Sequence, residues 1–374
     1  MKSVLLIDPH LSRAYASKLR GFLERVTFSS RVLITSRSSS SKEKAASWAV
    51  SNNISPSKIE IVSQGMDLTD AILLLECRTK LPVIVKKLLI KFNVKTIVSA
   101  NHFFCANMET VNFIKSQKQN AIIILENVSS QKNIEEAWRL DQGWSFEVLP
   151  PVIDSLSDQK RFDSMYSSRF ADMVPPGVLH AGVIMYHRPR KDRWPDSWWQ
   201  EKFKTLDYYP WRSYVHFNAE KLGVTSLSVV VEDNSKRNNF FNQIYRRIEI
   251  NLGIQRRRYT KYYDIDLTPY FQKFQFFICP QDIFSVFPQF GFHAMRAGLI
   301  IIGDESGVYR SLGFVDGKNY VSVGSEWSEI GIQNAIQRVK NFNVQGILKM
   351  REESIALLEG LVNQSELKLN NLLQ

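Results

Sequence analysis

Short apolar runs alternate with amphipathic stretches through the first part of the chain. The runs have the length and aliphatic content of buried strands, and they fall at residues 4–7, 31–35, 59–62, 96–99, 121–125 and 146–149. Between them, apolar residues recur at helical spacing, most clearly over residues 12–25 and 81–92. Strands that alternate with helices at this spacing predict an α/β fold with a parallel, doubly wound sheet.

This alternation is interrupted at residues 153–176, which are polar and irregular and are followed by Gly177. A chain of 374 residues favours about two domains. We therefore predict an N-terminal domain at 1–152, a linker at 153–176 and a C-terminal domain at 177–350. A final amphipathic helix, 351–374, could pack back on the N-terminal domain.

The C-terminal domain contains a clear strand, helix, strand unit. Apolar runs at 274–279 and 299–302 predict two buried strands, and residues 289–297 predict a helix that Gly298 stops. The loop 303–307 follows the second strand, and open α/β sheets bind ligands at the carboxyl ends of their strands. Small residues in that loop let backbone amides approach an anionic group, which predicts a ligand-binding loop.

The same segment carries a recognisable series of motifs. They are Phe290-Gly291-Phe292-His293-Ala294-Met295-Arg296-Ala297-Gly298, Ile300-Ile301-Ile302-Gly303-Asp304, Ser306-Gly307 and Asp316-Gly317-Lys318-Asn319-Tyr320. In order and spacing this last quarter of the chain resembles the nucleotide-sugar-binding half of glycosyltransferases with the GT-B fold, of the group 1 type. That family commonly has a Phe-Gly pair, a helix with Glu-Ala-Met-Ala-x-Gly, an apolar strand, a Gly-Gly loop and an Asp-Gly-x-Asn/Gly turn.

The resemblance implies two Rossmann-like domains facing a cleft. It also implies metal-independent transfer of a sugar from a nucleoside-diphosphate-sugar donor to a hydroxyl of a saccharide or lipid-linked acceptor. Ser306 and Gly307 would contact the donor, and His293 would lie near its ribose or phosphate. Retaining members usually carry two glutamates eight positions apart; this chain has Ser285 and His293 there, so the stereochemistry of transfer stays open.

Positive charge is in excess, with a formal net charge of +11, which suits an acidic partner. Arg188, Arg190 and Lys191 follow a predicted strand at 178–186, where the resemblance implies cations that neutralise the donor diphosphate. A second run, Arg256-Arg257-Arg258, is typical of a solvated turn, and its alternative is a patch facing an anionic membrane or an acceptor phosphate.

The N-terminal domain lacks a glycine-rich phosphate fingerprint after its first strand, so we assign it to the acceptor. A general base there must follow a strand. His102 and Asp8 are the leading candidates, with His10 and Glu126 as further ones. Each of these could equally be a capping or hydrogen-bonded structural residue.

Tryptophan and tyrosine are concentrated between residues 194 and 214, where Pro195 and Pro210 interrupt the helical spacing. We expect part of this segment to be a packed loop. Together with the nearby arginines it supports an alternative function, a non-catalytic protein that binds nucleic acid or another anionic polymer. We disfavour nucleic acid because no recognised nucleic-acid module is present. A nucleotide-sugar epimerase on the same fold is a further alternative.

The sequence contains no pattern typical of a metal site or a bound cofactor, so the only expected small molecule is the nucleotide-sugar donor. Its three cysteines, Cys77, Cys105 and Cys279, lack metal-ligand spacing and are expected to be reduced core residues. Asp264-Ile265-Asp266 has the letters of a metal-binding Asp-x-Asp motif but an unsuitable position. Without a signal peptide or a bilayer-length apolar run, we expect a cytoplasmic location, with peripheral contact at the inner membrane surface left open.

Overall fold

The computed structural model describes residues 3–7, 29–34, 55–77, 80–100, 106–126, 131–149, 177–185, 207–231, 267–281 and 286–374, together with residues 43, 46, 50, 103, 160, 163, 164, 166 and 200–202. Its chain forms two compact units. Unit 1 comprises Met1–Ser164, Phe284–Gln289 and Ala356–Gln374, and unit 2 comprises Met165–Ile283 and Phe290–Ile355.

Unit 1 contains a seven-stranded sheet in the order β3-β2-β1-β4-β5-β6-β7, with every neighbouring pair parallel. The strands are β1 Ser3–Ile7, β2 Ser29–Ile34, β3 Ile59–Ile61, β4 Ala71–Glu76, β5 Lys95–Ser99, β6 Ala121–Glu126 and β7 Ser145–Leu149. This is a doubly wound order, which reverses between β1 and β4. The apolar pattern gave every one of these strands except β4.

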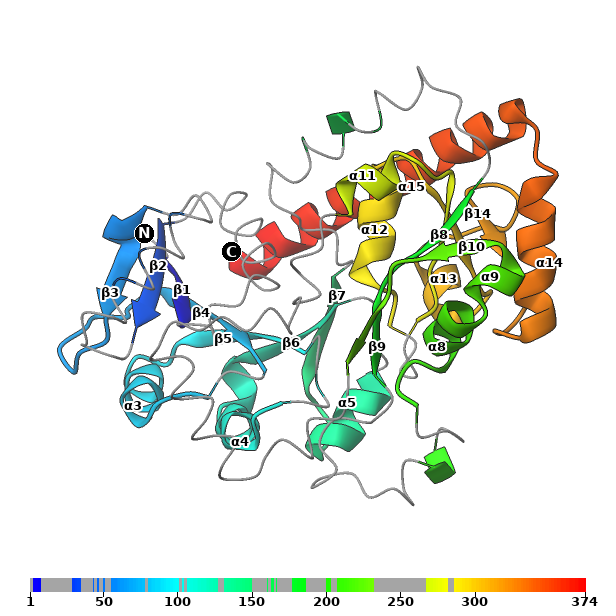
Figure 1. Ribbon diagram of the computed structural model, residues 1–374. Helices are drawn as coiled ribbons and strands as arrows, with labels where there is room; N and C mark the ends of the chain where they lie inside the picture. Colours follow the sequence, from blue (N-terminus) through cyan, green and yellow to red (C-terminus); the bar gives the residue numbers. More distant parts are fainter. Residues whose placement is uncertain are drawn as a thin grey trace, which may run out of the picture. The chain divides into compact units, whose positions relative to one another are not determined.

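Helices and 3-10 turns connect these strands: η1 Pro56–Lys58, α3 Val83–Lys91, α4 Met108–Ser116, η3 Lys118–Asn120 and α5 Gln131–Trp138 (Figure 1). Each α-helix buries one apolar face, as its amphipathic spacing requires. Asn107 caps α4 through its side chain, which accepts a hydrogen bond from the Thr110 amide. The buried indole of Trp138 donates to the Phe103 carbonyl at 2.9 Å, which fixes the end of α5.

The end of the last helix, α15 (Val344–Leu373), belongs to unit 1. Its residues Leu369, Leu372 and Leu373 share a core with Val4 of β1 and Ile97 of β5, among others. The Lys95 ammonium donates to the carbonyl of Leu372 at 2.7 Å, and so provides a hydrogen bond for a carbonyl of the last turn, which has no acceptor role within the helix. The helix thereby completes the core on one face of the unit 1 sheet.

Unit 2 contains a five-stranded parallel sheet in the order β10-β8-β12-β13-β14. The strands are β8 Val178–His180, β10 Val224–Ser226, β12 Phe276–Ile278, β13 Ile300–Gly303 and β14 Tyr320–Ser322. Beyond a two-residue break, β9 (Val183–Met185) and β11 (Val229–Val231) form a separate parallel pair. The single strand predicted over residues 178–186 is therefore two strands, divided at Ala181 and Gly182.

Both faces of the unit 2 sheet are covered by helices (Figure 1). Val178, Ile278 and Ile302 face a core shared with α8 (Pro210–Phe217), α9 (Ala219–Leu222), α14 (Glu329–Lys340) and the start of α15. Because side chains alternate along a strand, Phe277 points to the opposite face, where it packs edge-on against Phe271 of α11 (Thr268–Phe271). The remaining helices of the strand, helix, strand region are α12 (Gln289–Arg296) and α13 (Gly307–Ser311).

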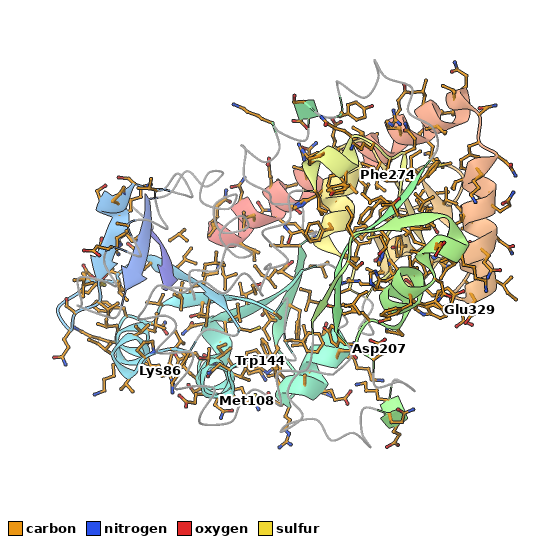
Figure 2. The ribbon with its side chains drawn as sticks, viewed as in Figure 1. Lys86, Met108, Trp144, Asp207, Phe274 and Glu329 are labelled. Atoms are coloured by element: carbon orange, nitrogen blue, oxygen red, sulfur yellow. The ribbon has the colours of Figure 1, made fainter. Side chains whose placement is uncertain are left out.

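The aromatic segment is helical from Pro210 onward, which corrects the prediction that Pro210 interrupts a helix; the predicted packed loop in part of the segment stays a prediction. Pro210 does not interrupt a helix but opens α8 at the first position, where a missing amide hydrogen costs nothing. Asp207, labelled in Figure 2, accepts a hydrogen bond from the Tyr209 amide at 2.9 Å just before this start. Residues 186–199 and 203–206 of the same segment lie outside the described residues.

Two of the three cysteines, Cys77 and Cys279, are buried and are not in a disulfide, as expected, while Cys105 lies outside the described residues. Within the described ranges, no helix combines the length and the apolar character needed to cross a bilayer.

Candidate functional site

The strand order of unit 2 reverses between β8 and β12, since β10 lies on one side of β8 and β12, β13 and β14 follow on the other. Ligands of open α/β sheets bind at such a point, beyond the carboxyl ends of the strands. Here β8 leads into Ala181-Gly182 and β12 into Cys279-Pro280-Gln281, and the neighbouring strand β13 leads into Asp304. These residues define the switch-point site.

Arg212, on α8, brings a positive charge to the switch-point site. Its Nε donates to the carbonyl of Pro280 at 2.9 Å, and its guanidinium lies 4.0 Å from the centre of the Tyr209 ring. Its Cδ lies 3.5 Å from the place that a Cβ on Gly182 would occupy. Arg212 therefore spans the residues that follow β8 and β12, in van der Waals range of Gly182.

A chain of hydrogen bonds runs beside this arginine. The indole of Trp327 donates to Oε1 of Gln281 at 3.2 Å, and Nε2 of Gln281 donates to Oδ2 of Asp304 at 3.0 Å. The Ser306 hydroxyl lies 3.1 Å from the same Nε2. Because an indole N–H can only donate, the Gln281 amide has one orientation, with its NH₂ group toward the carboxylate.

The Asp304 carboxyl group is only 3% exposed. Burial raises its pKa, and hydrogen bonds from Ser306 and Gln281 partly offset that rise. Its Oδ2 is held by Gln281, whereas Oδ1 is buried and has no described group in hydrogen-bonding geometry. A buried acceptor without a donor is costly, so Oδ1 marks a position suited to a donor group of a ligand.

The loop after β13 can form only because residue 303 is glycine. A Cβ built on Gly303 would lie 2.2 Å from the ring of Tyr309, whose hydroxyl donates to the Cys279 carbonyl at 2.6 Å. Tyr309 also stacks on Tyr320 of β14, with ring centres 5.7 Å apart. The ring thus joins the ends of β12, β13 and β14, and it holds the loop that carries Asp304 and Ser306.

The loop is also anchored to the residues after β14. The Glu305 amide donates to the Gly324 carbonyl at 2.9 Å, and the Ser322 hydroxyl donates to the Glu305 carboxylate at 2.9 Å. The Tyr320 hydroxyl donates to the backbone carbonyl of Asp304 at 3.3 Å. These bonds fix the backbone on both sides of Asp304.

The Asp316 to Tyr320 motif builds the turn that precedes β14. Asp316 accepts two hydrogen bonds from Arg338, at 2.8 and 3.0 Å, and one from the Ser322 amide at 2.7 Å. Gly317 has a φ of +73°, and Asn319 accepts from the Val315 amide at 2.8 Å. The local role of these motif residues is therefore structural.

A buried histidine lies at the carboxyl end of β8. His180 Nδ1 is 3.0 Å from the Ser226 hydroxyl and 3.1 Å from that of Ser228, and the Ser226 hydroxyl is 2.9 Å from Nδ1 of His216. Burial lowers the pKa of His180 to about 3, with the nearby charge of Arg212 as a smaller contribution. The imidazole is therefore neutral at physiological pH.

The structure describes some of the residues predicted from the sequence. Ser306 and Gly307 are adjacent at the start of α13, beside Asp304 and Gln281. His293 is half-buried on α12, with its ring edge-on to Phe290 at 5.7 Å between ring centres. Of the further candidate bases, Glu126 is the last residue of β6. The remaining predicted site residues lie outside the described residues: Asp8, His10, His102, Arg188, Arg190 and Lys191.

Two residues of the switch-point site, Arg212 and Gln281, were not singled out from the sequence, and Asp304 entered only as part of the predicted ligand-binding loop 303–307. Arg212 could have been found from the start of its helix, since Pro210 preceded by Asp207 is typical of a helix N-terminus. Gln281 comes three residues after β12 and Asp304 directly after β13, and ligand contacts are expected at these strand ends. Within the described residues there is no group of three His, Cys, Asp or Glu side chains that could hold a metal ion.

Comparison with known proteins gives structural matches only. No protein-family model and no curated protein matches the sequence. The structure of HepE from Anabaena, in complex with UDP and glucose, aligns over 99% of this chain and 99% of its own, with 11% identity and a TM-score of 0.53. A glycosyltransferase from Rickettsia africae aligns over 100% of this chain and 96% of its own, with 10% identity and a TM-score of 0.51.

These alignments extend over both units, and each unit is a parallel α/β sheet of doubly wound order. The chain therefore has the GT-B fold, with two Rossmann-like domains, as predicted. Membership of the group 1 type stays a prediction.

Proposed function

We propose that the protein is a glycosyltransferase that takes its sugar from a nucleoside-diphosphate-sugar donor and passes it to a hydroxyl of a saccharide or lipid-linked acceptor. The donor binds at the switch-point site of unit 2. The observation that carries this proposal is the position of Arg212, which is held against the Pro280 carbonyl at the reversal of strand order. Of the two structural matches, HepE was solved with UDP and glucose bound, and the Rickettsia africae protein is named a glycosyltransferase.

The chemistry explains why a fixed cation is needed there. The acceptor oxygen forms a bond to the anomeric carbon while the bond from that carbon to the diphosphate oxygen breaks, and the electron pair leaves on the diphosphate. Negative charge therefore grows on the leaving group during the reaction. A guanidinium already held in place by Pro280 and Tyr209 stabilises that charge without reorganising.

The remaining donor contacts follow from the predicted residues. Ser306 and Gly307, beside the Asp304 carboxylate, contact the donor, and His293 lies near its ribose or phosphate. Arg188, Arg190 and Lys191 add positive charge for the diphosphate. Because these cations offset the diphosphate charge, we expect transfer to proceed without a metal ion, and retention of activity in EDTA tests this.

The acceptor side belongs to unit 1. His102 or Asp8 takes the proton of the attacking hydroxyl, since in the sequence they follow β5 and β1, respectively. The surplus of positive charge would also favour an acceptor held at an anionic membrane surface.

Isothermal titration with uridine, guanosine, adenosine and cytidine diphosphates tests the donor site directly. We expect one of them to bind, and Arg212→Met to weaken it about 10- to 100-fold, because a charge-assisted contact to phosphate is lost. Arg212→Lys should recover part of the affinity, since it keeps the charge but not the planar fork. The corresponding nucleoside, which lacks phosphate, should bind the wild type and Arg212→Met equally.

Lys221 provides a matched control, since it is an exposed cation on the neighbouring helix α9. Lys221→Met removes the same charge and should leave diphosphate binding within about twofold. Equal losses in Arg212→Met and Lys221→Met would show that only net charge matters and would contradict the proposed site. Absence of binding by all four diphosphates would contradict the proposed function.

A further inference from the structure

Asp304 carries an unused hydrogen-bond acceptor in the switch-point site. Its carboxyl group is almost completely buried, yet among the described residues only Oδ2 accepts a hydrogen bond of good geometry. Buried polar atoms are nearly always satisfied by protein, water or ligand. Ser306 lies close enough to lower the pKa of this carboxyl group, but Oδ1 has no hydrogen bond of good geometry and can accept one from a donor outside the protein.

The orientation of this carboxylate is fixed by its neighbours. Trp327 donates to Gln281, and Gln281 donates to Oδ2, so the carboxylate cannot turn without breaking this chain of hydrogen bonds. Tyr320 holds the backbone carbonyl of the same residue. A side chain held in this way presents Oδ1 in one direction, which is the preorganisation that selective binding needs.

The chemistry of the neighbouring residues limits what the donor group can be. A carboxylate repels phosphate, so Oδ1 does not contact the diphosphate. Arg212 is bonded to the carbonyl of Pro280, and the next residue, Gln281, is bonded to Asp304. A cation suited to phosphate and an acceptor suited to a neutral donor group are thus held by two consecutive residues, Pro280 and Gln281.

We propose that Oδ1 of Asp304 accepts a hydrogen bond from a sugar hydroxyl of the donor, and that Gln281 and Trp327 position it for this purpose. This inference rests on the proposed donor site. The hydroxyl belongs either to the transferred sugar or to the ribose, and the two sources are separable by experiment.

The test compares Asp304→Asn with the wild type by isothermal titration, using UDP with UDP-glucose and GDP with GDP-mannose as probes. The substitution keeps an oxygen for Gln281 and replaces the charged acceptor Oδ1 by an amide NH₂ group. We expect an affinity loss of about 10-fold or more for the nucleotide sugar, as for a lost hydrogen bond to a charged group. If UDP or GDP keeps its affinity, the hydroxyl is on the transferred sugar; if both lose affinity equally, it is on the ribose.

Two further variants keep the test decisive. Glu326→Gln removes the same charge from an exposed residue that the site does not use, and should leave all affinities within about twofold. Gln281→Met removes the donor that orients Asp304 and should give the same selective loss, even if Asp304→Asn does not fold.

Unchanged affinity for every probe in both Asp304→Asn and Gln281→Met would overturn the inference while leaving the donor site in place. Failure of the wild type to bind any probe would overturn the proposed function and this inference with it.

Discussion

Replacement of Gly303 by alanine tests the packing that shapes the switch-point site. The added Cβ would lie 2.2 Å from Cε1 and Cζ of Tyr309 and 2.5 Å from its hydroxyl oxygen. Non-bonded carbon atoms prefer a separation of about 3.5–4.0 Å, so the ring must retreat by more than about 1 Å. The ring is fully buried, hydrogen-bonded to Cys279 and stacked on Tyr320, which leaves it no free direction.

The magnitude follows from these contacts. Overpacking of a well-packed core costs about 1–3 kcal/mol, and loss of the hydrogen bond from Tyr309 to Cys279 adds about 1 kcal/mol. Gly303→Ala should therefore lower the free energy of unfolding of unit 2 by about 2–4 kcal/mol. For a unit of this size, that corresponds to a fall in Tm of roughly 5–15 °C.

Gly307→Ala is the matched control, because a Cβ there meets no atom within 4 Å and the residue begins α13. This substitution should leave the free energy of unfolding unchanged or raise it by about 0.4–1 kcal/mol, because alanine lowers the conformational entropy of the unfolded chain. Urea unfolding followed by circular dichroism and by tryptophan fluorescence measures both variants, and the two probes distinguish the units if they unfold separately.

A double-mutant cycle identifies the cause of the loss. In a Tyr309→Leu background the clash is relieved, so Gly303→Ala should cost at least about 1 kcal/mol less than in the wild type. A loss of under about 1 kcal/mol for Gly303→Ala, or the same loss with and without the Tyr309 ring, would refute this account of the loop.

Two other predictions concern pH and the last helix. His180 has a folded-state pKa of about 3 against an ordinary value of 6.5, so folding opposes its protonation. The contribution of neutral His180 to the free energy of unfolding is therefore complete above pH 6.5. It falls as the pH drops toward 3, by up to about 1.4 kcal/mol per pH unit. In urea titrations at several pH values, the free energy of unfolding should fall less steeply with decreasing pH for His180→Asn than for the wild type. Equal slopes in the two proteins would contradict the low pKa of His180. Leu373→Ala, at a fully buried position, should cost unit 1 about 2–5 kcal/mol, whereas Leu367→Ala, at a position 64% exposed, should cost under about 0.5 kcal/mol by the same measurement.

Much of the fold was available from local patterns in the sequence. The strand, helix, strand unit around Phe292 was predicted nearly to its bounds, because short aliphatic runs and a helical apolar face are local signals. Gly298 stops α12 as predicted, with a φ of +83° that other residues rarely adopt. The GT-B fold was implied by the resemblance of the motifs in residues 290–320 to a known family, and the structural comparison confirms it.

The central strand β4 shows where local patterns are insufficient. Its sequence, Ala71-Ile72-Leu73-Leu74-Leu75-Glu76, is apolar on both faces and so has no periodicity that separates a strand from a buried helix. Only its pairing with β1 and β5 identifies it. The register of those pairs joins residues far apart in the chain.

The candidate site divides in the same way. The loop with Ser306 and Gly307 was found from the sequence, because small residues after an apolar strand are a local signal. Arg212 was not, because clustering of charge favoured Arg188 and its neighbours, whereas contact with the Pro280 carbonyl depends on how α8 packs on the sheet. Sequence by itself determined the elements and the class of fold; which side chains meet at the switch point was decided by tertiary packing, because those contacts join residues that no short-range pattern relates.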